Sequence, residues 1–387
     1  MLVKGFGNRW GRVAAMLGAA LMPGVCRAAG AYADAQQGIV VAGPGVAPHL
    51  GFACCEHSID SMQALFADPA VFASLRELHA TVAIAILDFS PQRTAVVQRL
   101  NRQGIPVVAW ILLPRDQGYY LTADNAPQAA ERLADFRKWT SRKGLHWAAV
   151  GLDIEPDFAW LAQFRGHRWR LMAALLGRSL NGGRIERARI AYARLIDRIR
   201  ADGYPVQVYQ MPYVPAERSV HSTLPDRLLG TVDVRGDENY LMLYTSDARA
   251  VGAGMIWSLG TLAQAIAIGS TDGDAPPGLG RGPLDWEEFS RDLIVASHFT
   301  RQIGVYDLEG CVRQGFLPRL VAMNWSKPVV ISAESARLAA RLGFASRCVL
   351  WIVTNFLYLA AIGLLLIAWI VWRRRAEKPG QARPVQG

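Results

Sequence analysis

Eight short apolar segments, each followed by a longer stretch with helical spacing, constrain the fold of this 387-residue chain most strongly. They are rich in β-branched residues and lack a clean polar/apolar alternation, which predicts strands buried on both faces. The predicted strands are Leu50–Cys55, Val82–Asp88, Pro106–Leu112, Trp147–Ile154, Val206–Met211, Tyr240–Tyr244, Ala265–Gly269 and Ile303–Leu308. The amphipathic stretches between them include Ser58–His79, Ala126–Lys143, Arg184–Ala201, Ala248–Leu262 and Trp286–Arg301.

Strands buried on both faces pair in parallel and need covering helices. Eight strand–helix units over about 260 residues match the size of a closed (β/α)8 barrel, the TIM barrel. A doubly wound open sheet is the alternative, but no Gly-x-Gly-x-x-Gly follows the first predicted strand. We therefore predict an α/β fold with a TIM-barrel domain over residues 34–345.

Both ends of the chain have the composition of targeting or membrane segments. A basic stretch, an apolar run and Ala31-Tyr32-Ala33 predict a signal peptide over residues 1–33, with an uncleaved anchor as the alternative. Val349–Trp372 contains no charged residue. At about 1.5 Å per residue it is long enough to span a bilayer, whereas a buried core helix is the alternative. Arg373–Arg375 follow, so the positive-inside rule places the tail, residues 373–387, in the cytoplasm.

The net charge of +10 resides mainly in these two ends, which carry +4 each and leave +2 for the rest. A near-neutral domain does not predict a nucleic-acid partner. Arginine greatly outnumbers lysine, and this bias is typical of GC-rich bacterial genomes. We therefore predict a single-pass protein of the inner membrane whose large domain is periplasmic.

Five cysteines are too few for a disulfide scaffold. Cys54, Cys55 and Cys311 fall within the predicted periplasmic domain. The first and eighth strands of a barrel are neighbours, so one bridge from Cys311 to Cys54 or Cys55 would close the seam between them. We predict such a bridge.

Catalytic residues of TIM barrels lie at the carboxyl ends of the strands. At the end of the fourth strand, Asp153 and Glu155 are two residues apart, so both side chains point to the same side. Two neighbouring carboxyl groups cannot both ionise freely, and one pKa rises, as a general acid for glycoside hydrolysis requires. The candidates for the second carboxylate are Asp307 and Glu309, with Asp88 and Glu56 behind them. Whether cleavage is retaining or inverting stays open.

The motifs Asp153-Ile154-Glu155 and Met242-Leu243-Tyr244 resemble those of glycoside hydrolase family 18, the chitinase-like barrels. This resemblance implies that Glu155 is the acid and that Asp153 supports it. Thr245 stands where that family has an aspartate. Barrels similar to family 25 lysozymes also carry Asp-x-Glu on a strand, so peptidoglycan is an open substrate alternative.

Aromatic residues near the strand ends are candidates for stacking on sugar rings; they are Tyr209, Tyr213, Tyr244, Trp110 and Trp160. The segment Phe158–Gly183 is longer than a plain strand–helix loop and is both basic and aromatic. It is interpreted as an extra helix, as a lid, or as a surface that rests on the membrane and handles an anionic or lipid-linked glycan.

Together these patterns predict a membrane-anchored glycoside hydrolase of the periplasm that acts on an envelope or extracellular polysaccharide and needs no cofactor or metal. Asp88 and Glu56 are expected to contact the substrate. One alternative is a non-catalytic glycan-binding factor in polysaccharide export. The other is a metal-dependent deacetylase, with Glu56, His57 and Asp60 as the metal ligands.

Overall fold

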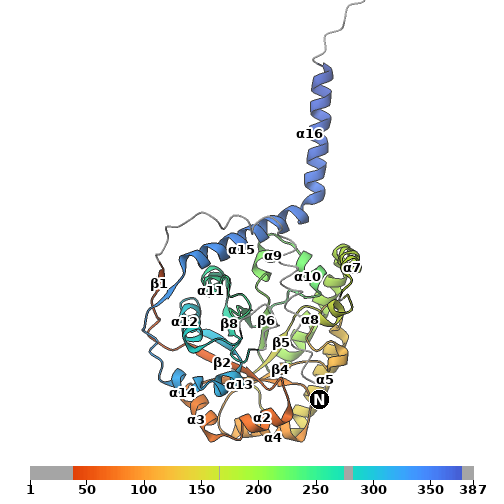
Figure 1. Ribbon diagram of the computed structural model, residues 1–387. Helices are drawn as coiled ribbons and strands as arrows, with labels where there is room; N and C mark the ends of the chain where they lie inside the picture. The colour runs from red at the N-terminus through yellow and green to blue at the C-terminus, as the bar shows by residue number, and fades with distance from the viewer. Residues whose placement is uncertain (1–37, 165, 274–281, 377–387) are drawn as a thin grey trace, which may run out of the picture.

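The computed structural model describes residues 38–164, 166–273 and 282–376. The predicted signal peptide and most of the tail lie outside these ranges. Eight parallel strands form a closed barrel in chain order, which confirms the TIM-barrel prediction (Figure 1). The strands are β2 (His49–Cys54), β3 (Thr81–Ile86), β4 (Val107–Ile111), β5 (Ala149–Asp153), β6 (Val206–Gln210), β7 (Glu238–Met242), β8 (Ala265–Gly269) and β9 (Gln302–Tyr306).

The pairing of β2 with β9 closes the barrel, with His49 opposite Gln302 and Ala53 opposite Tyr306. Because every neighbouring pair is parallel, all eight carboxyl ends meet at one rim. Large apolar side chains such as Ile84 belong to the main core, in which strands and helices pack together. Small residues, including Ala83, line the barrel interior and leave a cavity of about 160 Å³.

Helices cover the barrel on its outside. They are α2 (Ile59–Leu65), α3 (Pro69–Glu77), α4 (Pro91–Arg102), α5 (Ala126–Lys143), α6 (Phe158–Ala162), α7 (Arg168–Leu180), α8 (Gly182–Ala201), α9 (Val214–Ser219), α10 (Leu224–Leu229), α11 (Ala253–Leu259), α12 (Trp286–Ser297), α13 (Leu308–Arg313) and α14 (Phe316–Val321). Single 3-10 turns occur at Arg115–Gln117 and Gly260–Leu262. The predicted helix Ser58–His79 is two helices, because Asp68 caps a new helix whose first residue is Pro69.

A small antiparallel sheet was not predicted from the sequence. It pairs β1 (Ile39–Val41) with β10 (Val329–Ile331), so that Val40 lies opposite Val330. These three-residue strands are too short to be recognised in a sequence, since alternation needs more residues to be visible. The pairing fixes the start of the described chain beside the segment that leads into the C-terminal helices.

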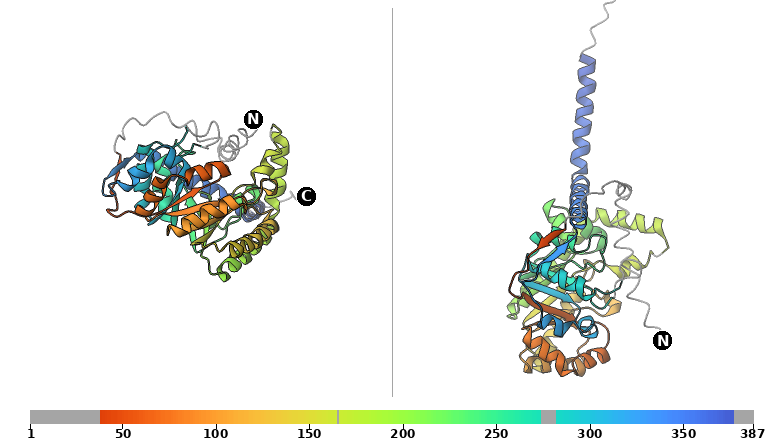
Figure 2. Two further views of the ribbon diagram at one scale, coloured as in Figure 1. Left: turned by 90° about the horizontal axis from the view of Figure 1, so that it is seen from below. Right: turned by 60° about the vertical axis from the view of Figure 1, so that its left-hand side comes forward.

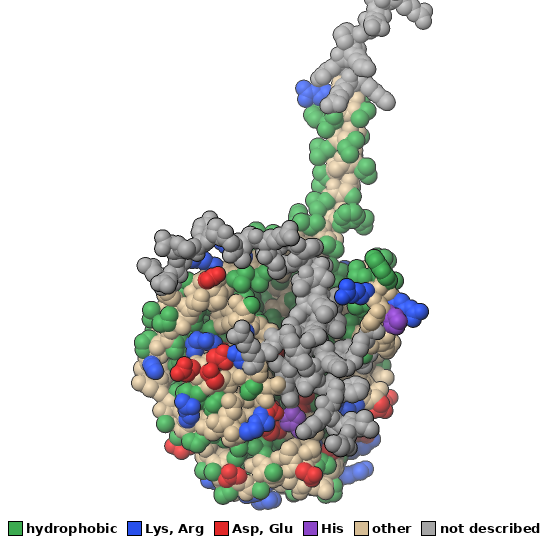
Figure 3. Space-filling model, in the orientation of Figure 1, with side chains coloured by type: hydrophobic (Ala, Val, Ile, Leu, Met, Phe, Trp, Pro, Cys, Tyr) green, Lys and Arg blue, Asp and Glu red, His purple; other side chains and the backbone are tan. Residues whose placement is uncertain are grey.

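Two helices, α15 (Ala333–Thr354) and α16 (Phe356–Ala376), end the described chain. The predicted membrane helix Val349–Trp372 is therefore interrupted at Asn355, and its first six residues belong to α15. α15 lies across the barrel domain against α11 and α9, whereas α16 points away from it (Figures 1 and 2). Hydrophobic side chains surround α16, and its segment Phe356–Arg373 is long and apolar enough to cross a membrane (Figure 3).

We predict that the close packing of α15 on α11 depends on Gly254. A Cβ atom at Gly254 would lie 2.4 Å from the backbone carbon of Ser335 and 2.5 Å from the nitrogen of Ala336. Gly254→Ala is therefore expected to lower the free energy of unfolding by about 1–3 kcal/mol, measured by urea denaturation of the full chain in detergent.

Gly343→Ala is the matched control for this substitution. Gly343 lies within α15, and a Cβ atom there would meet nothing within 4 Å. Alanine should be neutral or should stabilise α15 by up to about 1 kcal/mol. Equal effects of the two substitutions would contradict the described packing.

Candidate active site

Glu56 follows β2 and is held by three tyrosine hydroxyls at the carboxyl rim of the barrel. Tyr119 Oη donates to its Oε1 at 2.7 Å, Tyr120 Oη reaches the same oxygen at 3.3 Å, and Tyr306 Oη donates to Oε2 at 2.7 Å. Tyr306 ends β9, so its hydrogen bond crosses the seam that closes the barrel. Three hydroxyl donors therefore converge on one carboxyl group.

The two tyrosines after β4 are positioned by a tight turn. Gly118 has φ of 107° and Tyr119 has φ of 68°, both in the left-handed region. The amide of Asn125 donates to the carbonyl of Tyr120 at 2.9 Å and to that of Gln117 at 3.2 Å. The turn therefore presents both hydroxyls to Glu56.

Asp153 and Glu155 lie at the end of β5, where an extra parallel bridge extends the strand. The Leu121 amide donates to the Asp153 carbonyl at 3.1 Å, and the Glu155 amide donates to the Leu121 carbonyl at 3.2 Å. This extended backbone keeps alternate residues on one side of the strand, as the spacing predicts. The structure therefore brings Asp153 and Glu155 together beside Glu56.

Burial dominates the electrostatics of this group. It raises the pKa of Asp153 to about 8, with a further contribution from the charge of Glu56. Burial also raises the pKa of Glu155 well above its usual value, and Asp153 and Glu56 add to this shift. Asp153 is only 4% exposed, and its buried Oδ1 has no hydrogen-bond partner among the described residues. Burial therefore favours the protonated forms of Asp153 and Glu155 at neutral pH.

Aromatic rings surround these carboxyls. Tyr244 stacks on Tyr306 with ring centroids 5.6 Å apart, and Trp110 meets the edge of Tyr306 at 6.4 Å. Tyr209 packs against Tyr240 at 5.4 Å. Burial and the negative charges of Asp153 and Glu155 raise the pKa of Tyr244, so its hydroxyl stays protonated at neutral pH.

The two remaining predicted stacking residues have other contacts, and the charge of Glu155 contributes to the raised pKa of Tyr213. Tyr213 begins α9 and exchanges a hydrogen bond with Thr231 at 2.9 Å. Trp160 lies beneath the guanidinium of Arg178, whose carbon is 3.4 Å from the ring centroid. Trp160 lines an open cleft of about 480 Å³ together with Asp157, which is two residues beyond Glu155.

Asp307 and Glu309, the acids predicted at the end of the eighth strand, accept hydrogen bonds from backbone amides. Glu309 is in the first turn of α13 and accepts a hydrogen bond from the Cys55 amide at 2.6 Å. Asp307 caps the same helix by accepting from the Gly310 amide at 2.7 Å. Glu56 and Asp247 are instead the carboxylates that, with Asp153, raise the pKa of Glu155 by their charge.

Asp88 interacts with Arg93 and Ser90 and is separate from the group formed by Asp153, Glu155 and Glu56. Burial alone would raise its pKa, but hydrogen bonds from Arg93 and Ser90 lower it overall. Arg93 Nη2 lies 3.1 Å from Asp88 Oδ2. Asp88 therefore has a structural role at the start of α4.

The predicted bridge between Cys311 and Cys54 or Cys55 is not formed. All three thiols are free and buried. Cys311 lies in α13 beside the Thr271 hydroxyl, at 3.7 Å, while Cys54 and Cys55 contact each other. The seam is closed by backbone pairing of β2 with β9, and a cross-link is not required.

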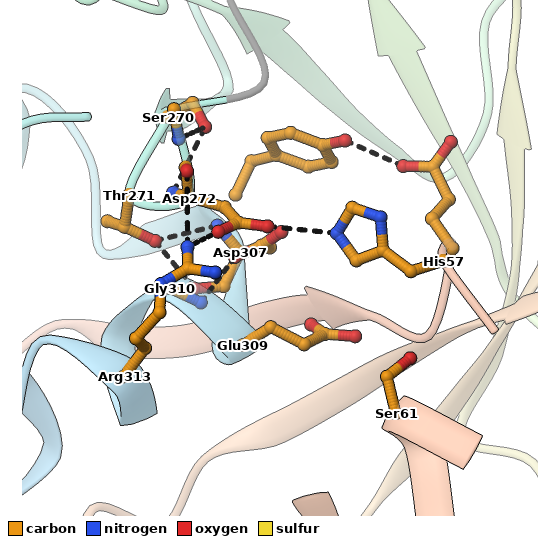
Figure 4. Close-up of polar contacts among 12 residues, drawn as sticks. His57, Ser61, Ser270, Thr271, Asp272, Asp307, Glu309, Gly310 and Arg313 are labelled. Atoms are coloured by element: carbon orange, nitrogen blue, oxygen red, sulfur yellow. Dashed lines mark hydrogen bonds and ion pairs between the residues drawn. The ribbon is translucent and has the colours of Figure 1, made fainter. Parts of the chain in front are cut away.

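A second polar group lies beside the first, at the ends of β2, β8 and β9 (Figure 4). His57 Nε2 is 2.9 Å from Asp272 Oδ2, and Asp307 lies close to both. Among the described residues, these three could hold a metal ion. The ligand set considered from the sequence, which included Glu56 and Asp60, is not the one that the fold assembles. Arg313 already forms an ion pair with Asp272, which supplies positive charge to this group.

No protein-family model matches the chain, and no curated protein matches it. Similar solved structures include the PgaB (BpsB) glycoside hydrolase domain from Bordetella bronchiseptica, 12% identical over 71% of this chain and 98% of that chain, with a TM-score of 0.41. A D-allulose 3-epimerase from Methylomonas sp. is 13% identical over 79% and 97%, with a TM-score of 0.37.

A protein proposed to be an alpha-L-fucosidase, from Bacteroides thetaiotaomicron VPI-5482, is 10% identical over 77% of this chain and 99% of that chain, with a TM-score of 0.39. The structural neighbours thus include glycoside hydrolases and another sugar-processing barrel. The resemblance to family 18 is not confirmed. At such low identities and TM-scores, the chemistry has to be argued from the site itself.

Tyr119 and Tyr120 were not predicted as site residues from the sequence, and Tyr306 was given no role. Their hydroxyls meet Glu56 only because a turn and the closing strand converge on it. The adjacent Tyr119-Tyr120 pair after a predicted strand end was the available signal. Aromatic pairs of this kind are common in cores, so the signal was weak.

We predict that Asp153 makes the protein less stable as pH rises. Its folded pKa of about 8 lies above its ordinary value of 3.8, so the folded state retains a proton that the unfolded chain loses. Stability from this group is complete below the ordinary value and is lost as pH rises toward 8. Asp153→Asn should reduce the fall in unfolding free energy between pH 5 and pH 8 by a few kcal/mol, measured by urea denaturation.

Asp88→Asn provides a comparison of opposite sign. The lowered pKa of Asp88 stabilises the folded state above its ordinary value, and this contribution is lost as pH falls through the folded pKa. The substitution should therefore destabilise the protein at neutral pH and leave the decline between pH 5 and pH 8 in place. An unchanged decline in Asp153→Asn would refute the burial argument.

Proposed function

We propose that this protein is a glycoside hydrolase that acts on an envelope polysaccharide from a membrane-anchored, periplasmic position. The observation that carries the proposal is the group formed by Asp153, Glu155 and Glu56 at the carboxyl rim. Buried acids with raised pKa values beside a further carboxyl group are the components that glycosidic cleavage needs. The barrel fold is compatible with this chemistry but does not by itself imply it.

In the proposed reaction, Glu155 donates its proton to the glycosidic oxygen as the bond to the anomeric carbon breaks. Asp153 supports the acid, because its proximity raises the pKa of Glu155. Glu56 is the second carboxylate, held by Tyr119 and Tyr306, and it either activates water or attacks the anomeric carbon. The configuration of the released sugar distinguishes these two routes.

The surroundings of the acids support a sugar substrate. Tyr244 and Tyr306 form a stacked aromatic pair next to Glu56, and apolar faces of sugar rings pack on such surfaces. The open cleft with Trp160 and Arg178 provides further aromatic and cationic groups close to the end of β5. We propose that neighbouring sugar units, including anionic ones, bind along this cleft.

The test is hydrolysis by the purified full chain, screened against bacterial envelope glycans, including peptidoglycan, by detecting new reducing ends. Glu155→Gln and Glu56→Gln should each lower the rate by about 10²–10⁴-fold, because each removes one acid/base partner. Glu77→Gln, an exposed substitution in α3, should leave the rate unchanged. Full activity of Glu155→Gln on its glycan would exclude the proposed acid.

A metal-dependent deacetylase is the second candidate, and the group of His57, Asp272 and Asp307 is the observation that favours it. Release of acetate that a chelator abolishes and added metal restores would support this function. Hydrolysis of glycosidic bonds that a chelator does not affect would support the carboxylate mechanism. Binding of glycan without any product would indicate the non-catalytic alternative.

A further inference from the structure

Helix α7 exposes a continuous apolar stripe to solvent. Its members are Trp169 (87% exposed), Met172 (59%), Leu176 (65%) and Leu180 (79%). At about 100° per residue, these positions fall within roughly one third of the helix circumference. The inner face of α7 carries Leu175, which is buried against the domain.

The stripe has the composition of a helix that lies in a membrane interface. Arg168 and Arg170 stand on either side of Trp169, so positive charge flanks the apolar face. Tryptophan prefers the level of lipid headgroups. An exposed apolar surface of this extent is uncommon on a soluble domain and indicates a binding surface.

The placement of α7 matches that of the proposed membrane helix. In Figure 2, right, α7 runs at a large angle to α16 and lies at the level where α16 leaves the domain. Hydrophobic side chains gather on the side of α7 from which α16 rises, with basic side chains beside them (Figure 3). A bilayer crossed by α16 would therefore meet the apolar stripe.

The exposed face of α15 is positively charged, like the first turn of the apolar stripe on α7. Arg337, Arg341 and Arg347 are exposed along this helix, together with Phe344 and, near its end, Trp351. α15 leads directly into α16, so this face lies next to the membrane that α16 would cross. Arginines beside exposed aromatic rings suit anionic lipid headgroups.

Helix α7 is firmly attached to the barrel. Arg178 forms ion pairs with Asp124 and Asp157, each at 3.0 Å, and Arg227 Nη1 donates to the Ser179 carbonyl at 2.5 Å. Asp157 follows Glu155 by two residues, so one of these ion pairs connects α7 to the segment that carries the proposed acid. Contact of the stripe with lipid would thus set how the rim approaches a glycan near the membrane.

We propose that α7 lies in the headgroup region of the same bilayer that α16 crosses, as a second point of membrane contact that favours anionic lipid. This inference rests on the proposed membrane anchoring by α16. The occupant of the stripe is lipid, because helices α7, α15 and α16 lie together on one side of the domain (Figure 1).

The experiment uses the full chain in nanodiscs of phosphatidylcholine and phosphatidylglycerol with nitroxide-labelled lipid. An environment-sensitive fluorophore is attached to a single introduced cysteine, with Cys26 and Cys348 replaced by serine; Cys54, Cys55 and Cys311 are buried. The labelled positions are Met172→Cys in α7, Leu364→Cys in α16 and Glu77→Cys in α3.

Nitroxide lipid should quench the label at position 172 by about twofold or more and the label at position 364 strongly, but should leave position 77 unaffected. Quenching at position 364 with none at 172 would overturn the α7 inference and leave the membrane anchor intact. Absence of quenching at position 364 would overturn the anchor and, with it, the inference.

A paired substitution checks that the stripe itself makes the contact. Leu176→Asp should reduce quenching at position 172, because a charged side chain in the stripe opposes insertion. Leu262 is 53% exposed outside α7, and Leu262→Asp should leave quenching at position 172 unchanged. If both substitutions left quenching at position 172 unchanged, the stripe would not be the lipid contact.

Discussion

The pairing of β2 with β9 is the interaction on which the rest of the structure depends. It joins the first and last strands of the barrel and sets Ala53 opposite Tyr306. Glu56 follows β2, so the same closure brings it within 2.7 Å of the Tyr306 hydroxyl. A sheet left open at this seam would retain most of its core but would separate the carboxylate from one of its donors.

The removal of water from the rim then decides the chemistry of the site. Desolvation is the largest contribution to the raised pKa of both Asp153 and Glu155. Tyr119 and Tyr306 also donate hydrogen bonds to Glu56 in the same group.

The sequence predicted the barrel well because buried parallel strands and amphipathic helices leave strong periodic signals. It also predicted that Asp153 and Glu155 point the same way, since that follows from strand geometry. It did not predict that Glu309 and Asp307 accept backbone hydrogen bonds at the start of α13, or that Cys311 lies within that helix. One helical turn redirects a side chain, and no local pattern in the sequence reveals where such a turn points it.

The C-terminal helices were also predicted only in part from the sequence. The apolar composition of residues 349–372 suggested one continuous helix, but it is interrupted at Asn355, and residues 349–354 belong to α15. The apolar stripe of α7 depends on which face the domain covers, so a sequence alone could not distinguish it from a core helix.

The proposed mechanism requires that Glu155 keeps its proton at neutral pH beside Asp153 and Glu56. Infrared difference spectroscopy of the carbonyl stretch of protonated carboxyl groups tests this claim directly, by comparing the wild-type chain with Glu155→Gln at pH 7. The account predicts a protonated-carboxyl band in the wild type that disappears in the variant. If the difference spectrum instead showed the loss of an ionised carboxylate, Glu155 would not be the acid.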